Sequence, residues 1–88
     1  MALTIEYTDA ARRQLRKLDK PSARRILDYM DKRIAPLEDA RALGKALRGS
    51  LGEFWRYRVG DFRIICQLND GLLRVLVVRL ADRKDVYR

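Results

Sequence analysis

Apolar and polar residues alternate along several stretches of the chain, as they do in half-buried β-strands. Residues 3–7 carry an apolar side chain at every second position. Two longer alternating runs flank Gly60–Asp61, a two-residue step with glycine first that is typical of a β-hairpin turn. Residues 72–80 are almost wholly apolar, which indicates a strand that is covered on both faces for part of its length. The pattern therefore predicts four strands.

Two stretches between the first strand and the hairpin carry apolar residues at helical spacing. Thr8 or Asp9 is placed to cap the first helix, whose apolar stripe includes Leu15. Pro21 suits the first turn of the second helix, and Pro36 ends that helix or lies just beyond it. The apolar positions of the second helix are Ala23, Ile26, Leu27, Met30 and Ile34. The short break between the two predicts an antiparallel helix pair.

Residues 36–52 give a weaker pattern. One or two helical turns fit residues 37–43, and the glycines that follow favour a loop around the short segment 45–48. The element order is therefore β-α-α-β-β-β, an α+β fold in a single domain, residues 1–88. We expect the last three strands to form an antiparallel meander, with the first strand at an edge or beside the last strand. The helix pair covers one face of this sheet and leaves the other largely bare.

The hairpin places arginines together on the bare face. A two-residue turn at Gly60–Asp61 pairs Arg58 with Arg63, and directly paired residues share a face of the sheet. The predicted core face carries Trp55, Tyr57, Val59, Phe62, Ile64 and Cys66. The opposite face carries Phe54, Arg56, Arg58, Arg63, Ile65 and Gln67. Opposed like charges destabilise a sheet by ~0.2–1 kcal/mol, so this arrangement favours an anion bound between them.

The overall charge agrees with an anionic partner. The chain has 20 Lys plus Arg against 12 Asp plus Glu, a net charge of +8, and 15 of the basic residues are arginine. Arginine presents a planar fork that suits phosphate and keeps its charge under ordinary conditions. Composition alone leaves two interpretations open: a nucleic-acid-binding protein, or a soluble protein with a basic surface.

Several function classes are excluded. Cys66 is the single cysteine and the chain has no histidine, so an internal disulfide, a zinc site and a Cys/His or Ser/His nucleophile do not fit. No basic, apolar leader opens the chain, and no run approaches the ~20 apolar residues that span a bilayer. We therefore expect a cytoplasmic protein with no metal, no cofactor and no membrane partner.

Three segments carry a resemblance to a known family: Lys45–Gly49, the hairpin run Trp55–Arg63, and the closing Asp82–Tyr87. Together with the element order, they make the chain similar to the RelE/ParE superfamily of small bacterial toxins, and most of all to RelE-type mRNA interferases. The resemblance implies a metal-independent endoribonuclease that cuts mRNA in the ribosomal A site. It also implies a cognate antitoxin, acidic and folding on binding, through which the complex can bind operator DNA.

The resemblance assigns roles to eight residues. It implies catalytic roles for Arg56, Arg58, Arg63, Arg83 and Tyr87. It implies RNA contacts for Lys45, Arg48 and Lys84. The chain departs from the family pattern at three kinds of position. Some active members have lysine where this chain has Arg56 and Arg58, Asp82 replaces a common His or Lys, and Phe62 replaces a frequent Tyr. Arginine cannot exchange protons as lysine can, so the proton-transfer scheme is left open.

These residues suit phosphodiester cleavage mainly through electrostatics. The arginines can grip the phosphate and stabilise the charge that it gains. Tyr87 is the candidate base, although a phenol with pKa near ~10 is only ~0.1% ionised at neutrality unless neighbouring guanidinium groups lower that pKa. Arg83 would assist near the leaving oxygen. We therefore expect weak cleavage of free RNA, with the ribosome supplying much of the acceleration through positioning.

Less specific interpretations stay open. Arg58 or Arg63 can pair with a carboxylate such as Glu53 or Asp85, and Tyr87 can pack the tail on the sheet. The first helix carries a basic face that is either solvated or in contact with ribosomal RNA: Arg12, Arg13, Arg16 and Lys17. The alternative functions are a ParE-like non-nuclease toxin that inhibits DNA gyrase and a catalytically inactive RNA-binding or repressor-partner module.

Overall fold

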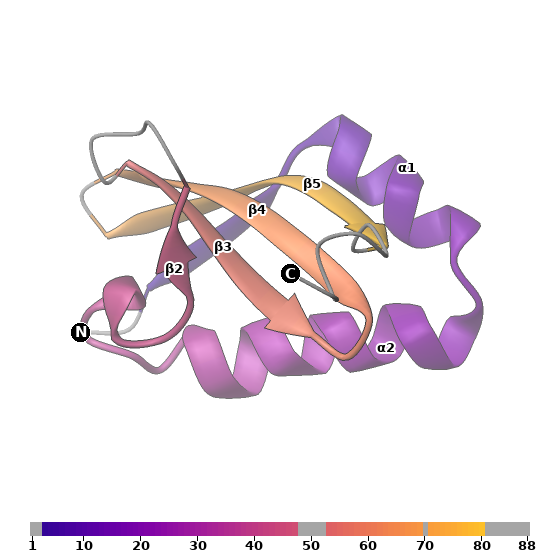
Figure 1. Ribbon diagram of the computed structural model, residues 1–88, viewed down its shortest axis with the longest axis horizontal. Helices are drawn as coiled ribbons and strands as arrows, with labels where there is room; N and C mark the ends of the chain where they lie inside the picture. The colour runs from indigo at the N-terminus through magenta and orange to yellow at the C-terminus, as the bar shows by residue number, and fades with distance from the viewer. Residues whose placement is uncertain (1–2, 48–52, 70, 81–88) are drawn as a thin grey trace.

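The computed structural model describes residues 3–47, 53–69 and 71–80. Its elements along the chain are β1 (Thr4–Tyr7), α1 (Asp9–Lys17), α2 (Lys20–Tyr29), a π-helical turn η1 (Met30–Ile34), a 3₁₀ turn η2 (Ala40–Ala42), β2 (Lys45–Ala46), β3 (Phe54–Val59), β4 (Phe62–Asn69) and β5 (Leu72–Leu80). Figure 1 shows them in the order expected from the sequence, with β2 as an addition.

The five strands form one sheet in the order β1-β5-β4-β3-β2. The meander of β3, β4 and β5 is antiparallel, as predicted, and β1 lies at the edge beside β5. β1 runs parallel to β5, so the sheet is mixed and not antiparallel throughout. The path of the chain explains this: β1 and β5 both start at the same end of the sheet, to which α2 brings the chain back after β1 (Figure 1).

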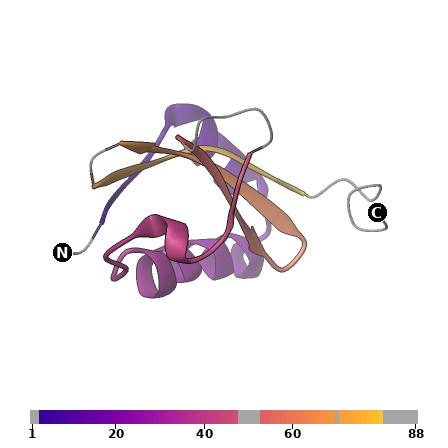
Figure 2. The ribbon, with the colours of Figure 1, turned by 60° about the vertical axis from the view of Figure 1, so that its left-hand side comes forward.

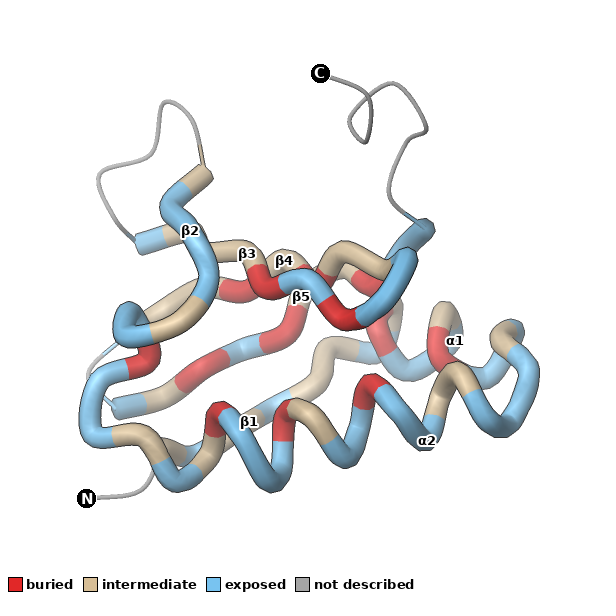
Figure 3. The backbone as a smooth tube through the Cα atoms, turned by 60° about the horizontal axis from the view of Figure 1, so that its bottom comes forward, coloured by how far each residue is buried: buried red, intermediate tan, exposed pale blue. Residues whose placement is uncertain are grey.

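Both helices pack on one face of the sheet, α1 against β5 and α2 against β3 (Figure 3). Figure 2 shows the sheet curving over α2. The buried core between these layers comprises Ala11, Leu15, Ile26, Met30, Ile34, Ala40, Tyr57, Val59, Ile64, Cys66, Leu73, Val75 and Val78. The prediction of the apolar stripe of α2 was wrong at one position, because Leu27 is 41% exposed. Successive helix positions lie about 100° apart, so Leu27 points away from a sheet that touches α2 on one side only.

Side chains cap the starts of both helices, Thr8 at α1, as predicted, and Asp19 at α2. The Thr8 hydroxyl accepts a hydrogen bond from the Ala11 amide at 3.1 Å and donates one to the Leu76 carbonyl at 3.3 Å. The Asp19 carboxylate accepts from the Ser22 amide at 3.2 Å. Hydrogen bonding to Ser22, first to its side chain and then to its backbone amide, lowers the pKa of Asp19. Thr8 thus both starts α1 and ties it to β5.

Among residues 3–47, 53–69 and 71–80, no helix has the length and apolar character that crossing a membrane requires.

Candidate functional site

The β3–β4 hairpin has the predicted register. Val59 pairs with Phe62 across the turn, Gly60 has a φ of 58°, and Arg58 lies directly opposite Arg63. On the core face of the hairpin Tyr57, Val59, Ile64 and Cys66 are buried, Tyr57 with no exposed surface, and Trp55 and Phe62 are half-buried. Arg58 is exposed and Arg63 half-buried on the other face. The prediction that this hairpin separates an apolar face from an arginine face is confirmed.

β2 adds a lysine to the arginine face. Lys45 is paired with Arg56 across the β2–β3 ladder, so the two cations share a face. Gly44 makes this pairing possible, because it has a φ of 79° and a Cβ there would lie 2.3 Å from the Arg56 carbonyl oxygen. Only glycine fits such a left-handed, close approach without strain.

Two aromatic side chains of β3 hold the segment that precedes Lys45. The Tyr57 hydroxyl donates a 2.7 Å hydrogen bond to the Ala40 carbonyl, and Trp55 Nε1 donates a 2.6 Å bond to the Leu43 carbonyl. Trp55 is also covered by the Arg41 guanidinium, 5.9 Å from its ring centroid. Core-face residues of β3 therefore position the neighbouring β2, whose Lys45 lies on the opposite face of the sheet.

A β-bulge extends the row of arginines onto β5. The ladder between β4 and β5 pairs Cys66 with Val75, then slips by one residue so that Arg63 lies opposite Arg79. Arg58, Arg63 and Arg79 thus form a row across three adjacent strands. Helix α1 supports the slipped segment, because Gln14 Oε1 accepts a 2.7 Å hydrogen bond from the Val78 amide.

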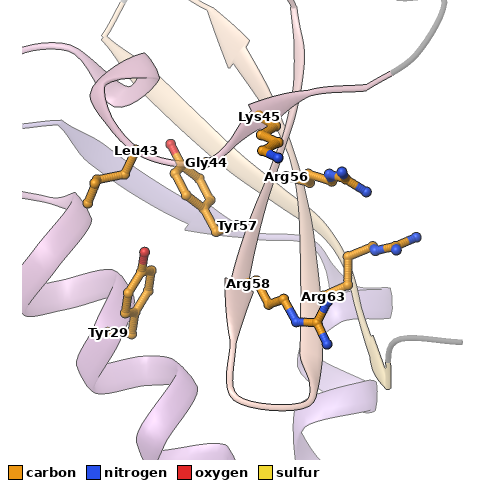
Figure 4. A pocket seen from close by; sticks show the side chains of 8 residues that line it. All are labelled: Tyr29, Leu43, Gly44, Lys45, Arg56, Tyr57, Arg58 and Arg63. Atoms are coloured by element: carbon orange, nitrogen blue, oxygen red, sulfur yellow. The ribbon is translucent and has the colours of Figure 1, made fainter. Parts of the chain in front are cut away.

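A cavity of about 350 Å³ opens between this cationic face and the edge of β3. Its lining residues are Tyr29, Leu43, Gly44, Lys45, Arg56, Tyr57, Arg58 and Arg63. In Figure 4 the charged ends of the lysine and the three arginines gather on one side of the hairpin, and the two tyrosines and Leu43 lie on the other. The site therefore combines a cluster of positive charge with an apolar wall.

Two arginines of the cluster, Arg56 and Arg58, are not neutralised by carboxylates of the described residues. Within the described part of the chain, the ion pairs are Arg41–Asp39 and Arg74–Glu6, and neither Arg56 nor Arg58 has a carboxylate partner. Of the pairings that the sequence left open, Arg58–Glu53 does not form, and Asp85 lies outside the described residues. Arg58 Nε instead donates a long, 3.4 Å bond to the Gly60 carbonyl, which holds the side chain over the turn.

Comparison with known protein families shows which family the chain belongs to. Residues 5–87 match the family model described as the ParE toxin of the type II toxin–antitoxin system parDE. The chain belongs to the RelE/ParE superfamily of type II toxins. The toxin is 30% identical to the toxin RelG of Mycobacterium tuberculosis over 90 residues, covering 100% of this chain and 99% of RelG. It is 31% identical to the toxin RelE of the same organism over 85 residues, covering 96% and 84% of the two chains.

Solved structures agree on the fold. The toxin matches the toxin–antitoxin complex RelBE2 of Mycobacterium tuberculosis with a TM-score of 0.81 at 23% identity, over 92% of this chain and 93% of that one. It matches the isolated RelE toxin of E. coli with a TM-score of 0.74 at 19% identity, over 98% and 92% of the two chains. Both likenesses establish the RelE-like α+β fold for this toxin.

The structure brings together half of the residues that the sequence singled out. Lys45, Arg56, Arg58 and Arg63 line one cavity. The remaining four lie outside the described residues: Arg48, Arg83, Lys84 and Tyr87. Sequence reasoning missed Arg79, whose place in the row depends on the bulge, and Tyr29, which reaches the cavity from α2.

The described part of the toxin supplies charge but few proton-transfer groups. Burial raises the pKa of Tyr57 and raises that of Tyr7 to about 12. Burial likewise raises the pKa of the Cys66 thiol to about 12. These groups stay protonated at neutral pH, so none of them is a base or nucleophile there. No cluster of three or more potential metal ligands occurs among residues 3–47, 53–69 and 71–80.

Proposed function

We propose that this toxin is a ribosome-dependent endoribonuclease that cleaves mRNA and thereby inhibits translation. The observation that carries the proposal is the convergence of Lys45, Arg56, Arg58 and Arg63 on one cavity of about 350 Å³. Such a cluster, without carboxylates beside Arg56 or Arg58 in the described chain, fits the negative charge of an RNA backbone phosphate.

The arginines would act by stabilising the phosphorane formed when the 2′-hydroxyl attacks the phosphate. A preorganised donor of this kind contributes ~3–4 kcal/mol to lowering the barrier. Lys45 differs from the arginines because its ammonium can exchange protons as well as hold charge. We propose that Tyr87 serves as the base and that Arg83 assists the leaving 5′-oxygen, with Arg48 and Lys84 binding the RNA backbone. The reaction needs no metal in this scheme.

Two further features of the proposal concern partners. The relatives are named RelG and RelE, and one of the solved structures is a complex named RelBE2, which combines a toxin with an antitoxin. We propose that a cognate antitoxin likewise inhibits this toxin in the cytoplasm, with an acidic segment that covers the arginine face or displaces the C-terminal segment. The charge of +8 favours such a partner, and operator binding would then occur through the antitoxin.

The alternative is a ParE-like toxin that inhibits DNA gyrase without cutting RNA. The matched family model favours this alternative, because its description names ParE toxins. The arginine face favours the nuclease, since a non-nuclease inhibitor has no need of a row of opposed cations that weakens the sheet.

Primer extension on ribosome-bound mRNA tests the proposal. We expect the wild-type toxin to produce cuts within codons in the A site, and Arg63→Ala to reduce the cleavage rate by ~10²–10³-fold. Arg74→Ala is the matched control: Arg74 lies on β5 in an exposed ion pair with Glu6 at 3.2 Å, outside the cavity, and its loss should leave cleavage unchanged.

Tyr87→Phe examines the proposed base separately. It removes one hydroxyl and keeps the ring, so a large loss of cleavage supports proton transfer by Tyr87, whereas full activity refutes that role. Intact mRNA together with inhibited DNA supercoiling would replace the nuclease proposal with the gyrase alternative.

A further inference from the structure

A second groove lies between the turn of the β3–β4 hairpin and α2. It has a volume of about 400 Å³. Its lining residues are Arg25, Asp28, Tyr29, Lys32, Arg33, Arg58, Val59 and Gly60. The helical members recur every three or four residues along α2 and η1, so they form one stripe that faces the turn.

This groove is cationic. It has four basic side chains and one acidic side chain, Asp28. Arg25, Lys32 and Arg33 are exposed, and none of them forms an ion pair with Asp28 within the described chain. Arg25 lies over the turn, because a Cβ at Gly60 would come within 2.8 Å of its guanidinium. The groove thus offers several separated positive charges to one extended anion.

An aromatic ring lies between these charges. Tyr29 is half-buried, lines both cavities, and packs at a 58° tilt against Tyr57 with 6.5 Å between ring centroids. The Arg33 guanidinium lies 6.0 Å from the Tyr29 centroid. Tyr57 is fixed through its hydroxyl bond to Ala40, so it supports Tyr29 from behind. An aromatic ring beside arginine and lysine is the arrangement on which nucleobases stack with little regard to sequence.

The groove is continuous with the first cavity, because Arg58 and Tyr29 line both of them. We propose that it is a second single-stranded RNA subsite, which binds the nucleotide next to the scissile phosphate. In this subsite Tyr29 stacks on a base, and Arg25, Lys32 and Arg33 contact flanking phosphates. The inference rests on the proposed function and adds the position and chemistry of a substrate contact on α2. The carboxylates of an acidic peptide would use the cations, but they offer no ring that stacks on Tyr29 as a nucleobase does.

Fluorescence anisotropy with 2′-O-methyl RNA, which lacks the attacking hydroxyl, measures binding without cleavage. We expect an eight-nucleotide strand to bind wild-type toxin more tightly than a single nucleotide, which can occupy only one of the two cavities at a time. Lys32→Ala combined with Arg33→Ala should remove most of that length advantage. It should also reduce the slope of log affinity against log salt by about 1.4, since each phosphate contact on a single strand contributes ~0.7.

The matched control is Arg12→Ala combined with Arg13→Ala, which removes two exposed charges from α1, outside either cavity. The control should keep the length advantage. Tyr29→Leu should weaken binding of the longer strand by roughly 5- to 150-fold through lost stacking, whereas Tyr29→Phe, which keeps the ring, should bind like wild type. Chemical denaturation of each variant checks that the fold is intact.

The outcomes separate this inference from the proposed function. If the groove variants bind the longer strand as tightly as wild type, while the wild-type toxin still cleaves ribosome-bound mRNA, the subsite is refuted and the nuclease stands. If the variants keep RNA binding but lose affinity for the antitoxin, the groove is a protein-docking surface and the subsite is again refuted. Absence of cleavage by the wild type overturns the proposed function, whatever the groove binds.

Discussion

The two faces of the β3–β4 hairpin are made of alternate residues in the same strands, yet their chemistry is opposite. On the core face, Tyr57 and Ile64 are paired and fully buried. One residue nearer the turn on each strand, Arg58 and Arg63 are paired on the open face. Neighbouring positions therefore serve different ends, because the core face provides the free energy of folding and the open face provides the charge.

The open face reduces the stability that the core face provides. Opposed like charges cost a sheet ~0.2–1 kcal/mol per pair, and the row across β3, β4 and β5 contains two such pairs, Arg58–Arg63 and Arg63–Arg79. Apolar burial on the other face can offset this cost, since one large buried side chain is worth ~1.5–3 kcal/mol. The comparison indicates that the stability of the sheet comes from the core face and not from the charge on the open face.

The largest expected effect is a difference between adjacent substitutions. Tyr57→Ala should lower the free energy of unfolding by ~3–5 kcal/mol, because it leaves a cavity in the core and removes the bond to the Ala40 carbonyl. Arg58→Ala should change it by less than ~1 kcal/mol, with stabilisation the expected direction, since a repulsive pair with Arg63 is removed. Urea denaturation at neutral pH measures both. Comparable destabilisation by the two variants would show that the two faces do not differ in what they contribute to stability.

The hairpin register is the part of the site that the sequence predicts well. Gly60–Asp61 sets a two-residue turn, and strict alternation then assigns every side chain of β3 and β4 to a face. The same reasoning fails on β5. The ladder between β4 and β5 begins with Asn69 opposite Leu72. Without an interruption, this register would place Arg63 opposite Val78. The slip between Ile65 and Cys66 brings Arg79 there instead.

That slip arises from tertiary contacts which alternation cannot reveal. β1 pairs with β5 only as far as Val75. Beyond Val75, the side chains of Thr8 and of Gln14 in α1 form hydrogen bonds with the edge of β5. The position of Lys45 is equally hard to predict, because it depends on hydrogen bonds from β3 side chains to a loop that has little pattern of its own. The roles of Arg83 and Tyr87 stay predictions, because both residues lie outside the described part of the chain.

Gly44 allows the link between the two faces to be tested. Gly44→Ala should lower the free energy of unfolding by ~1–3 kcal/mol, because it combines a left-handed φ of 79° with a clash against the Arg56 carbonyl. It should also weaken RNA binding by displacing Lys45. Gly71→Ala is the matched control, since Gly71 has a φ of 82° but nothing within 4 Å of its Cβ position. Denaturation of both variants isolates the clash, and an equal loss from each would mean that β2 does not approach β3 as closely as described.

The pH dependence of stability also distinguishes the two faces. Burial raises the pKa of Tyr57, and that of Cys66 to about 12, so the folded state keeps protons that the unfolded chain releases above about pH 8.5 for the thiol and about pH 10 for the phenol. Stability is therefore complete below these unfolded values and falls as pH rises toward the folded ones, by ~1.4 kcal/mol per pH unit for each fully titrating group. Denaturation between pH 8 and 11 should show this fall. Tyr57→Phe should make it shallower above pH 10, whereas Arg58→Ala should leave the slope unchanged, because arginine keeps its charge throughout that range.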